Sequence, residues 1–466
     1  MPIMKYAILS LLSAAIANGS NIIQRQTILG TSTVNLNNNT GSISHLASGI
    51  LYGIPDTQGQ IPASFYTDMG FNYARAGGAQ VPSPGRGWIW GLSEYKVRFA
   101  SALSNYKSTR AHGGKFIFLI HDLWGADGSQ NSSAPYPGDN GNWASWDAYL
   151  TQLISDINAN GATDGLSIDI WNEPDLTIFW NRTQAQYFQL WGRTYHRLRA
   201  AFPNVPLIGP AYANGPSLSS TWWTGFASFV KTNNSIPDQW VWHMEGGNGN
   251  MGAAYSGLQQ ILSTYGLPQK TVNIDEYGTS AEQVPSGTAW WISQLERYNA
   301  IGLRGNWLSG WSLHDFMAGL LGKPNAGTSS YSPTATGYWP NGEWQVYKYY
   351  NLNMTGHRVG TSASADAQLD TYATIGSTQV KILCGVRVAT GTWQITVNSL
   401  SSVGLPTSGT LNIHTWGFPN TGGSFGSVTA LNDLGTAAHT YSGNSVTFPI
   451  YQVDTTTAYA FEFNVG

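Results

Sequence analysis

Residues 166–174 read LSIDIWNEP, a short run in which apolar and polar side chains alternate before an amide, a carboxylic acid and a proline. The alternation is typical of a β-strand, and a proline is rarely found inside a central strand. Asn172 and Glu173 therefore stand at the end of a predicted strand. The stretch TVNIDEYG at 271–278 repeats the pattern and brings Glu276 to the end of a second one.

Eight runs of this kind alternate with longer segments between about residues 48 and 350. In chain order they are GILYGI, FNYARAGG, KFIFLIHDLWG, LSIDIWNEP, PLIGPAYA, QWVWHMEGG, TVNIDEYG and NWLSGWSLHDF. The intervening segments 143–161 and 183–203 bring apolar residues round at three- and four-residue spacing, which indicates amphipathic helices. This alternation predicts an α/β fold, the (β/α)8 or TIM barrel.

Polar or aromatic side chains stand at the C-terminal ends of the predicted strands. In chain order they are Arg75, His121, Asn172 with Glu173, Tyr212, His243, Glu276 and Trp311. The active sites of (β/α)8 barrels lie at this end, because the strand ends and the loops that follow them converge there. The sequence therefore predicts one functional site at one mouth of the barrel.

The pattern changes after residue 357. The stretches 371–388, 391–400, 409–418, 444–453 and 458–466 show period-two or apolar runs, punctuated by Gly, Pro, Ser and Asn. Such runs are typical of an antiparallel β-sandwich. We therefore predict a signal peptide at 1–20, a strand segment at 21–47 that pairs either with the sandwich or with the barrel, a catalytic barrel at 48–356 and a β-sandwich at 357–466.

Composition excludes several classes of partner. Charged residues make up only 10% of the 466 residues and the net charge is −3, without any basic run, so neither nucleic acid nor a membrane is an expected partner. A hydrophobic fraction of 42% argues against disorder. Neither a metal-ligand spacing nor a glycine-rich nucleotide loop follows a strand, so we expect no metal and no cofactor.

The first residues favour secretion. Lys5 precedes an apolar run over 6–17 that ends among small residues, which is typical of a cleaved secretory signal. Acceptor patterns for N-linked glycans begin at Asn18, Asn38, Asn131, Asn181, Asn233 and Asn353. Together these features predict an extracellular glycoprotein.

Two carboxylic acids on facing strands of one barrel are suited to cleaving a glycosidic bond. One acid protonates the leaving oxygen, and the other meets the positive charge that develops on the sugar. Glu173 and Glu276 end the fourth and seventh runs, which face each other across the mouth of an eight-stranded barrel. A carboxylate separation of about 5–5.5 Å would retain the anomeric configuration, whereas about 6.5–9.5 Å would invert it.

The motifs WNEP at 171–174 and IDEYG at 274–278, with the opening stretch 47–80, resemble glycoside hydrolase family 39, a family of clan A retaining glycosidases, and particularly its secreted fungal members. The resemblance covers nearly the whole chain, because these enzymes also carry a β-sandwich behind the barrel. It implies that Glu173 is the acid/base and Glu276 the nucleophile. It also implies that Asn172 binds the sugar 2-hydroxyl and that Arg75 supports the charge of Glu276.

Further candidates have more than one interpretation. His243 is similar to a sixth-strand histidine that touches the sugar or the nucleophile in that family, although a structural histidine fits the sequence as well. His121, with Asp122, is a candidate for a subsite, and Trp311 for the floor under the cleaved sugar, with Trp307 deeper. Glu245 is the rival catalytic carboxylate, Asp175 is a candidate helix cap, and candidates for outer subsites are Trp124, Trp290, Trp339 and Trp344.

The sequence thus predicts a secreted retaining glycoside hydrolase that acts by double displacement on a neutral plant-wall or extracellular oligo- or polysaccharide. It would be β-xylosidase-like, or would act on side chains that contain arabinose or galactose. One alternative is an endo-acting clan A glycanase, since the loop 124–144 either walls a closed pocket or lines an open cleft. The other is a carbohydrate-binding protein without turnover.

Overall fold

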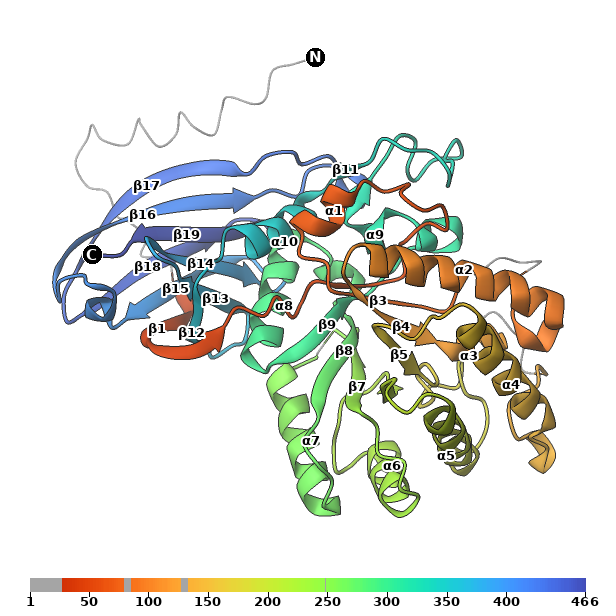
Figure 1. The fold of residues 1–466 in the computed structure, drawn as a ribbon. Coiled ribbons are helices and arrows are strands. Elements are labelled where there is room, and N and C mark those ends of the chain that lie inside the picture. The colour runs from red at the N-terminus through yellow and green to blue at the C-terminus, as the bar shows by residue number, and fades with distance from the viewer. Residues whose placement is uncertain (1–26, 79–84, 127–132, 248) are drawn as a thin grey trace.

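The computed structural model describes residues 27–78, 85–126, 133–247 and 249–466. Within these ranges eight parallel strands close into a barrel, in which each strand pairs with its neighbours in chain order (Figure 1). The strands are β2 (Gly49–Leu51), β3 (Tyr73–Ala76), β4 (Lys115–Leu119), β5 (Leu166–Asp169), β6 (Leu207–Tyr212), β7 (Gln239–Met244), β8 (Thr271–Tyr277) and β9 (Ala300–Arg304). The predicted (β/α)8 barrel is confirmed.

Helices cover the outside of the barrel (Figure 1). They are α1 (Ala63–Asp68), α2 (Leu92–Ala111), α3 (Ile120–Trp124), α4 (Ala144–Ala159), α5 (Gln184–Ala201), α6 (Thr221–Thr232), α7 (Met251–Tyr265), α8 (Pro285–Arg297), α9 (Phe316–Gly319) and α10 (Gly342–Leu352). The two segments with helical spacing form α4 and α5. In α5 the spacing buries Tyr187, Leu190, Trp191 and Leu198 on the side of the core.

The last barrel strand differs from the prediction. We expected it within 306–316, but it is β9, formed by the residues AIGLR at 300–304. The expected segment instead leads into a short 3-10 helix, η4 (Gly310–His314). Aromatic side chains suggested a strand at 306–316, whereas the buried strand is the plain apolar stretch that comes before it.

The lower part of the barrel is filled with apolar side chains. Tyr73, Ile117, Ile208, Val241 and Leu303 belong to a cluster of buried residues separate from the rest of the core. Side chains two positions apart on a strand share one face, so the residues two positions after Tyr73 and Val241 also face the barrel interior. Those positions hold the polar residues Arg75 and His243, so the barrel interior is apolar below and polar at its C-terminal end.

The second domain is one mostly antiparallel sheet. Within the described ranges it has nine strands in the order β17-β16-β19-β14-β13-β12-β1-β15-β18. They are β1 (Ile28–Ser42), β12 (His357–Ser362), β13 (Leu369–Ile375), β14 (Gln379–Val386), β15 (Gly391–Asn398), β16 (Gly409–Phe418), β17 (Asn432–Tyr441), β18 (Ser445–Gln452) and β19 (Ala458–Asn464). The edge strands β17 and β18 contact each other, so the sheet doubles over around a hydrophobic core of its own.

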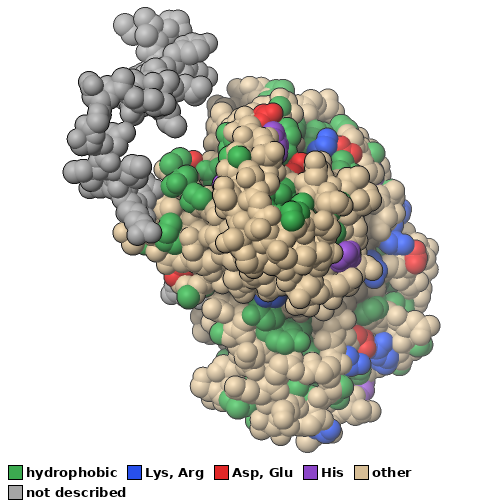
Figure 2. All heavy atoms as spheres, turned by 90° about the vertical axis from the view of Figure 1, so that its left-hand side faces the viewer, with side chains coloured by type: hydrophobic (Ala, Val, Ile, Leu, Met, Phe, Trp, Pro, Cys, Tyr) green, Lys and Arg blue, Asp and Glu red, His purple; other side chains and the backbone are tan. Residues whose placement is uncertain are grey.

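Strand β1 comes before the barrel in the chain but lies inside this sheet. It runs antiparallel to β12 and parallel to β15, for example with Val34 opposite Thr361 on one side and Val397 on the other. Figure 2 shows that the outer face of this domain carries mainly uncharged side chains with scattered hydrophobic ones. The predicted signal peptide and the acceptor residues Asn18 and Asn131 lie outside the described residues.

The sheet packs against α8. The Ser286 hydroxyl donates to the Val386 carbonyl at 2.9 Å, and the Trp290 indole N–H donates to the Ala367 carbonyl at 3.0 Å. A Cβ at Gly385 would lie 1.9 Å from the Ser286 carbonyl oxygen, so only glycine permits this close approach. The sheet therefore supports the helix that follows β8. No helix in the described parts of the chain is both long and apolar enough to cross a membrane.

Candidate active site

A cavity of about 550 Å³ opens at the C-terminal end of the barrel. Its walls come from the ends of, and the segments that follow, β2, β4, β5, β6, β7, β8 and β9. Its volume lies in the range of about 300–1,000 Å³ that is usual for small-molecule sites. This is the mouth of the barrel at which the sequence predicts a functional site.

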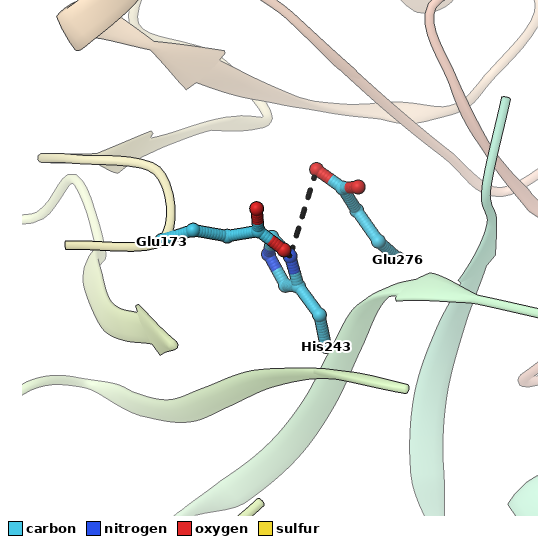
Figure 3. A group of neighbouring side chains, drawn as sticks. All are labelled: Glu173, His243 and Glu276. Carbon is cyan, nitrogen blue, oxygen red and sulfur yellow. Dashed lines mark hydrogen bonds and ion pairs between the residues drawn. The ribbon is translucent and has the colours of Figure 1, made fainter. Parts of the chain in front are cut away.

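Glu173 and Glu276 meet in this cavity. Glu276 lies on β8, and Glu173 lies in the segment after β5. One carboxylate oxygen of each lies within 4.8 Å of the other and of a nitrogen of His243, and Figure 3 shows the His243 ring between the two glutamates. The side chains of Glu173 and Glu276 are only 13% and 11% exposed, so both carboxylates face the cavity from largely buried positions.

The backbone conformation of Glu173 is strained. Its φ of 41° lies in the left-handed region, which is costly for a residue with a Cβ. The Glu173 N–H donates to the Ala211 carbonyl at 2.9 Å, and its carbonyl accepts from the Leu176 N–H at 2.9 Å. These bonds hold the strained turn and fix the direction in which the carboxylate points.

Asp175 ties this turn to the segment after β6. Its carboxylate accepts from the Ala213 N–H at 2.9 Å, the Asn214 N–H at 3.1 Å and the Asn214 side-chain amide at 2.8 Å. The prediction that Asp175 caps a helix is wrong, because turns follow it and the N-cap of α5 is Thr183. Its role is to clamp two strand-end segments together.

Arg75 is the fully buried hub beneath the cavity. Its guanidinium forms an ion pair with Glu276, donates to Asp169 at 2.6 Å and to the Asn172 side-chain oxygen at 2.7 Å, and lies 3.1 Å from Asp275. The bond from Arg75 occupies the Asn172 oxygen, so the Asn172 Nδ2 group remains to donate to a ligand. Although burial lowers the pKa of Arg75, the surrounding carboxylates raise it by more, so the guanidinium stays charged.

His243 contacts both glutamates. Its Nδ1 hydrogen-bonds Glu173 at 2.8 Å and lies 3.8 Å from Glu276, while its Nε2 lies 3.2 Å from Asp275. Burial lowers the pKa of His243, but the charges of Glu276 and Asp275 raise it well above its usual value. A raised pKa favours the imidazolium form of His243. Of the two roles left open by the sequence, the geometry favours contact with the two candidate glutamates.

Burial raises the pKa of Glu276, and the charges of Glu173 and Asp275 raise it further against the opposing effect of His243 and Arg75. The pKa of Asp169 is raised to about 7, mainly because burial outweighs its ion pair with Arg75. Buried carboxylates crowded together therefore compete for a limited amount of positive charge.

Glu245 is a third glutamate in the same cavity. Burial, and then the charge of Glu276, raise the pKa of Glu245 well above its usual value, which favours its protonated form. A Cβ at Gly305 would lie 1.8 Å from its Oε1 atom, so the carboxyl group packs directly on that glycine. The residue predicted as a rival carboxylate is thus a neighbour of Glu276.

The two remaining predicted site residues lie outside the cavity lining, among the described residues. His121 is buried in α3, with its ring 5.4 Å from that of Trp171, whereas Asp122 next to it does line the cavity. Trp311 is 57% exposed on η4, and Trp307 lines the cavity in its place. Trp311 was expected at a strand end, but β9 ends earlier, which moves Trp311 out onto the loop.

The tryptophans proposed for outer subsites are mostly core residues. Trp124, Trp290 and Trp344 are at most 4% exposed, and Trp339 pairs within a two-stranded sheet. Asp122, which the sequence offered with His121 for a subsite, lines the cavity. Sequence analysis missed Tyr52, which also lines the cavity and whose hydroxyl donates to the Asp122 carboxylate. Its place at the end of the first predicted strand was the available signal.

Glu173, His243 and Glu276 could each offer one atom to a metal ion. Those atoms already have partners, because Arg75 pairs with Glu276 and His243 hydrogen-bonds Glu173. A cation would have to displace a buried guanidinium that carries the same sign of charge. The arrangement therefore suits a pair of carboxyl groups that act directly on a ligand better than it suits a metal centre.

No protein-family model and no curated protein sequence matches the chain. Solved structures do match its fold. The structure of N2152 from Neocallimastix frontalis superposes with a TM-score of 0.71 at 19% identity, over 94% of this chain and 100% of that one. A monomeric β-xylosidase from Caulobacter crescentus CB15 matches with a TM-score of 0.56 at 17% identity, over 93% and 99% of the two chains.

A family 39 glycoside hydrolase from Xanthomonas axonopodis pv. citri matches with a TM-score of 0.57 at 12% identity, over 95% of this chain and 99% of that one. The barrel with its β-sheet domain is therefore a fold that this chain shares with glycoside hydrolases. The resemblance to family 39 noted in the sequence is confirmed at the level of the fold.

Proposed function

We propose that the protein is a retaining glycoside hydrolase that cleaves O-glycosidic bonds by double displacement. The observation that carries this proposal is the approach of the Glu173 and Glu276 carboxylates to within 4.8 Å of each other. Retaining enzymes hold their two carboxyl groups about 5–5.5 Å apart, whereas inverting enzymes leave about 6.5–9.5 Å for a water molecule. The observed spacing leaves no room for that water.

In the first step Glu276 attacks the anomeric carbon, and Glu173 gives a proton to the leaving oxygen. Arg75 and His243 favour the charged form of Glu276 that this attack needs. In the second step Glu173 takes a proton from water, which displaces Glu276 and restores the original anomeric configuration. The Asn172 Nδ2 group, oriented by Arg75, would donate to the sugar 2-hydroxyl and bind the transition state more strongly than the substrate.

The lining of the cavity suits a neutral sugar. Four carboxyl side chains line it, those of Asp122, Glu173, Glu245 and Glu276, and no lysine or arginine does so among the described residues. A uronic acid would therefore meet repulsion. Apolar faces of a sugar can pack on the rings of Tyr52, Phe179 and Trp307. Pentose or neutral hexose units of plant-wall or extracellular glycans fit these conditions, and one of the matching structures is named as a β-xylosidase.

Secretion and glycosylation are part of the same proposal. The sequence of residues 1–20 supports export, and acceptor residues Asn38, Asn181 and Asn353 are exposed. Asn233 is less suitable, because its side-chain oxygen is hydrogen-bonded to His196 at 3.1 Å. Expression in a eukaryotic host, followed by mass spectrometry of the secreted protein, tests both the cleavage of the signal and the occupied sites.

The test of the catalytic assignment is a covalent trap. The protein is screened against a panel of aryl glycosides, and the anomer first released is identified by NMR. A 2-deoxy-2-fluoro glycoside of the accepted sugar should then leave a sugar attached to Glu276, which peptide mass spectrometry would locate. Asp433→Asn on the exposed strand β17 serves as a control variant that should label normally.

Three results would contradict the proposal: release of the inverted anomer, a label on Glu245, or binding of oligosaccharide without any hydrolysis. The last result would instead support a carbohydrate-binding protein. In that case Glu276→Ala should leave binding unchanged as well, because the carboxylate would have no chemical step to perform.

A further inference from the structure

A second cavity of about 580 Å³ lies beside the first. It is formed by the segment after β6, the segment after β7 and the first turns of α7. Ala213, Asn214 and Gly246 line both cavities, so the two are adjacent and share part of their lining. His243, which bonds Glu173, lines the second cavity, whereas Glu276 lines only the first.

The second cavity is kept open by small residues. A Cβ built on Gly246 or Gly247 would meet no atom of the described chain within 4 Å, so this wall borders free space. On the opposite side a Cβ at Gly257 would lie 2.0 Å from the Pro216 carbonyl oxygen. Glycine there lets α7 pack directly against the segment after β6 and close the far wall.

The chemistry of this lining differs from that of the first cavity. Apart from His243, its polar side chains are neutral amides and hydroxyls, those of Asn214, Ser217, Asn250, Ser256 and Gln260. Among the described residues, no aromatic ring other than His243 and no carboxylate lines it. Such a surface binds an uncharged, hydroxyl-rich group through hydrogen bonds, without the aromatic surface that the first cavity provides.

The position of the second cavity relates to the direction of bond cleavage. A general acid must lie next to the leaving oxygen, so the leaving group extends on the side of Glu173. Asp175, two residues after Glu173, is the clamp that holds Ala213 and Asn214, and these two residues form the shared wall. The second cavity therefore lies beside the segment of Glu173, on the side to which a leaving group would extend.

We infer that the second cavity is a leaving-group subsite that binds a neutral sugar unit, so that the substrate is a glycan of at least two linked sugars with one sugar on each side of the cleaved bond. This inference rests on the proposed function and adds the class of substrate to it. The enzyme selects its leaving group as well as the sugar that it attacks. It cleaves between two recognised sugars.

The inference is tested by filling the second cavity from two separate elements. Gly247→Trp in the segment after β7 and Ser256→Trp on α7 place an indole in it, and both residues line only this cavity. Ser263→Trp is the matched control, because Ser263 is an exposed serine on the same helix that does not line the cavity. Thermal melting confirms that each variant is folded.

Two substrates separate the subsite from the chemistry. A glycosyl fluoride has a leaving group of one atom and needs no leaving-group subsite, whereas a di- or trisaccharide of the same sugar needs one. We expect the ratio of kcat/KM for the oligosaccharide to kcat/KM for the fluoride to fall at least tenfold in both cavity variants. The ratio should stay within twofold of wild type in Ser263→Trp.

If the ratio of the two kcat/KM values is unchanged in both cavity variants, the second cavity is not a leaving-group subsite. Hydrolysis of the glycosyl fluoride would in that case still support the proposed function. Absence of hydrolysis of every fluoride and every oligosaccharide by the wild-type protein would overturn the proposed function itself, and the subsite with it. The two failures are therefore told apart by the wild-type fluoride assay.

Discussion

Arg75 on β3 and Glu276 on β8 form an ion pair in which the arginine is fully buried. The same guanidinium holds Asp169 and Asn172, so the proposed nucleophile is tied to the strand that leads to the proposed acid. One buried cation thus favours the charged form of Glu276 and links the ends of the two strands that lead to the proposed acid and nucleophile.

Replacement of Arg75 by Met should be costly for stability as well as for activity. It would leave buried carboxylates without their partner, and breaking a buried ion pair in this way typically costs about 3–5 kcal/mol. Urea denaturation measures this loss. Arg75→Lys keeps the charge but loses the forked geometry, so it should recover part of the stability while kcat stays reduced. Equal stability of all three proteins would contradict the hub role.

Glu173→Ala should lower kcat/KM for substrates with poor leaving groups by about 10²–10⁴-fold, the usual contribution of a general acid. Glycosyl fluorides, whose leaving group needs no proton, should lose far less in the first step. Added azide should restore turnover by replacing the water that Glu173 activates, and the product should be a glycosyl azide of retained configuration. A uniform loss on all substrates without rescue by azide would argue against this role.

His243 should control the pH dependence of both stability and activity. Its pKa in the folded protein is raised, so it stabilises the fold fully below the unfolded value of about 6.5, and this stabilisation is lost as pH rises through the folded pKa. His243→Gln should flatten that part of the curve of unfolding free energy against pH. It also removes a cation that lowers the pKa of Glu276, so the acid limb of kcat/KM should move to higher pH.

The Trp307→Ala and Trp311→Ala variants form a matched pair. The two residues are 49% and 57% exposed, but only Trp307 lines the cavity. Trp307→Ala should raise KM up to about tenfold, which corresponds to about 1.4 kcal/mol of binding free energy. Trp311→Ala should leave KM within twofold. The reverse result would restore the assignment made from the sequence.

Glu245 should act as a neutral acid beside Glu276. Glu245→Gln keeps a neutral hydrogen-bonding group of the same shape, so kcat/KM at pH 7 should stay within about threefold of wild type, since the raised pKa of Glu245 favours its neutral form. Gly305→Ala should lower activity at least tenfold, because the added methyl group occupies the position of the Glu245 carboxyl group. A strong loss in Glu245→Gln would show that this residue works as a charged group.

The features predicted correctly from the sequence are those that depend on short segments of the chain. Strand ends that carry Asn172, Glu173 and Glu276 indicated both the barrel and the mouth at which the chemistry lies, because alternation and polar endings are local properties. The last strand was misplaced for the same reason. Residues 306–316 are rich in aromatic side chains, and only the closed barrel shows that AIGLR at 300–304 is the segment with neighbours on both sides.

Contacts between distant segments could not be predicted. Arg75 reaches groups on two other strand-end segments, those of β5 and β8, and Asp175 bonds the segment after β6 instead of a helix. The sequence did not indicate which tryptophans are buried. Trp290 is buried and Trp307 is half exposed, and this difference depends on the segments that pack around each of them. The second cavity is formed largely by glycines and small side chains, which make no recognisable sequence motif.

The central position of β1 has a consequence for biosynthesis. This strand leaves the ribosome before the barrel, yet its partners β12 and β15 are made only after the barrel is complete. The edges of β1 that pair with β12 and β15 therefore stay unsatisfied until the C-terminal strands have been synthesised. The same order means that no single proteolytic cut can release the two domains as intact pieces, since the distal sheet holds a strand from either side of the barrel.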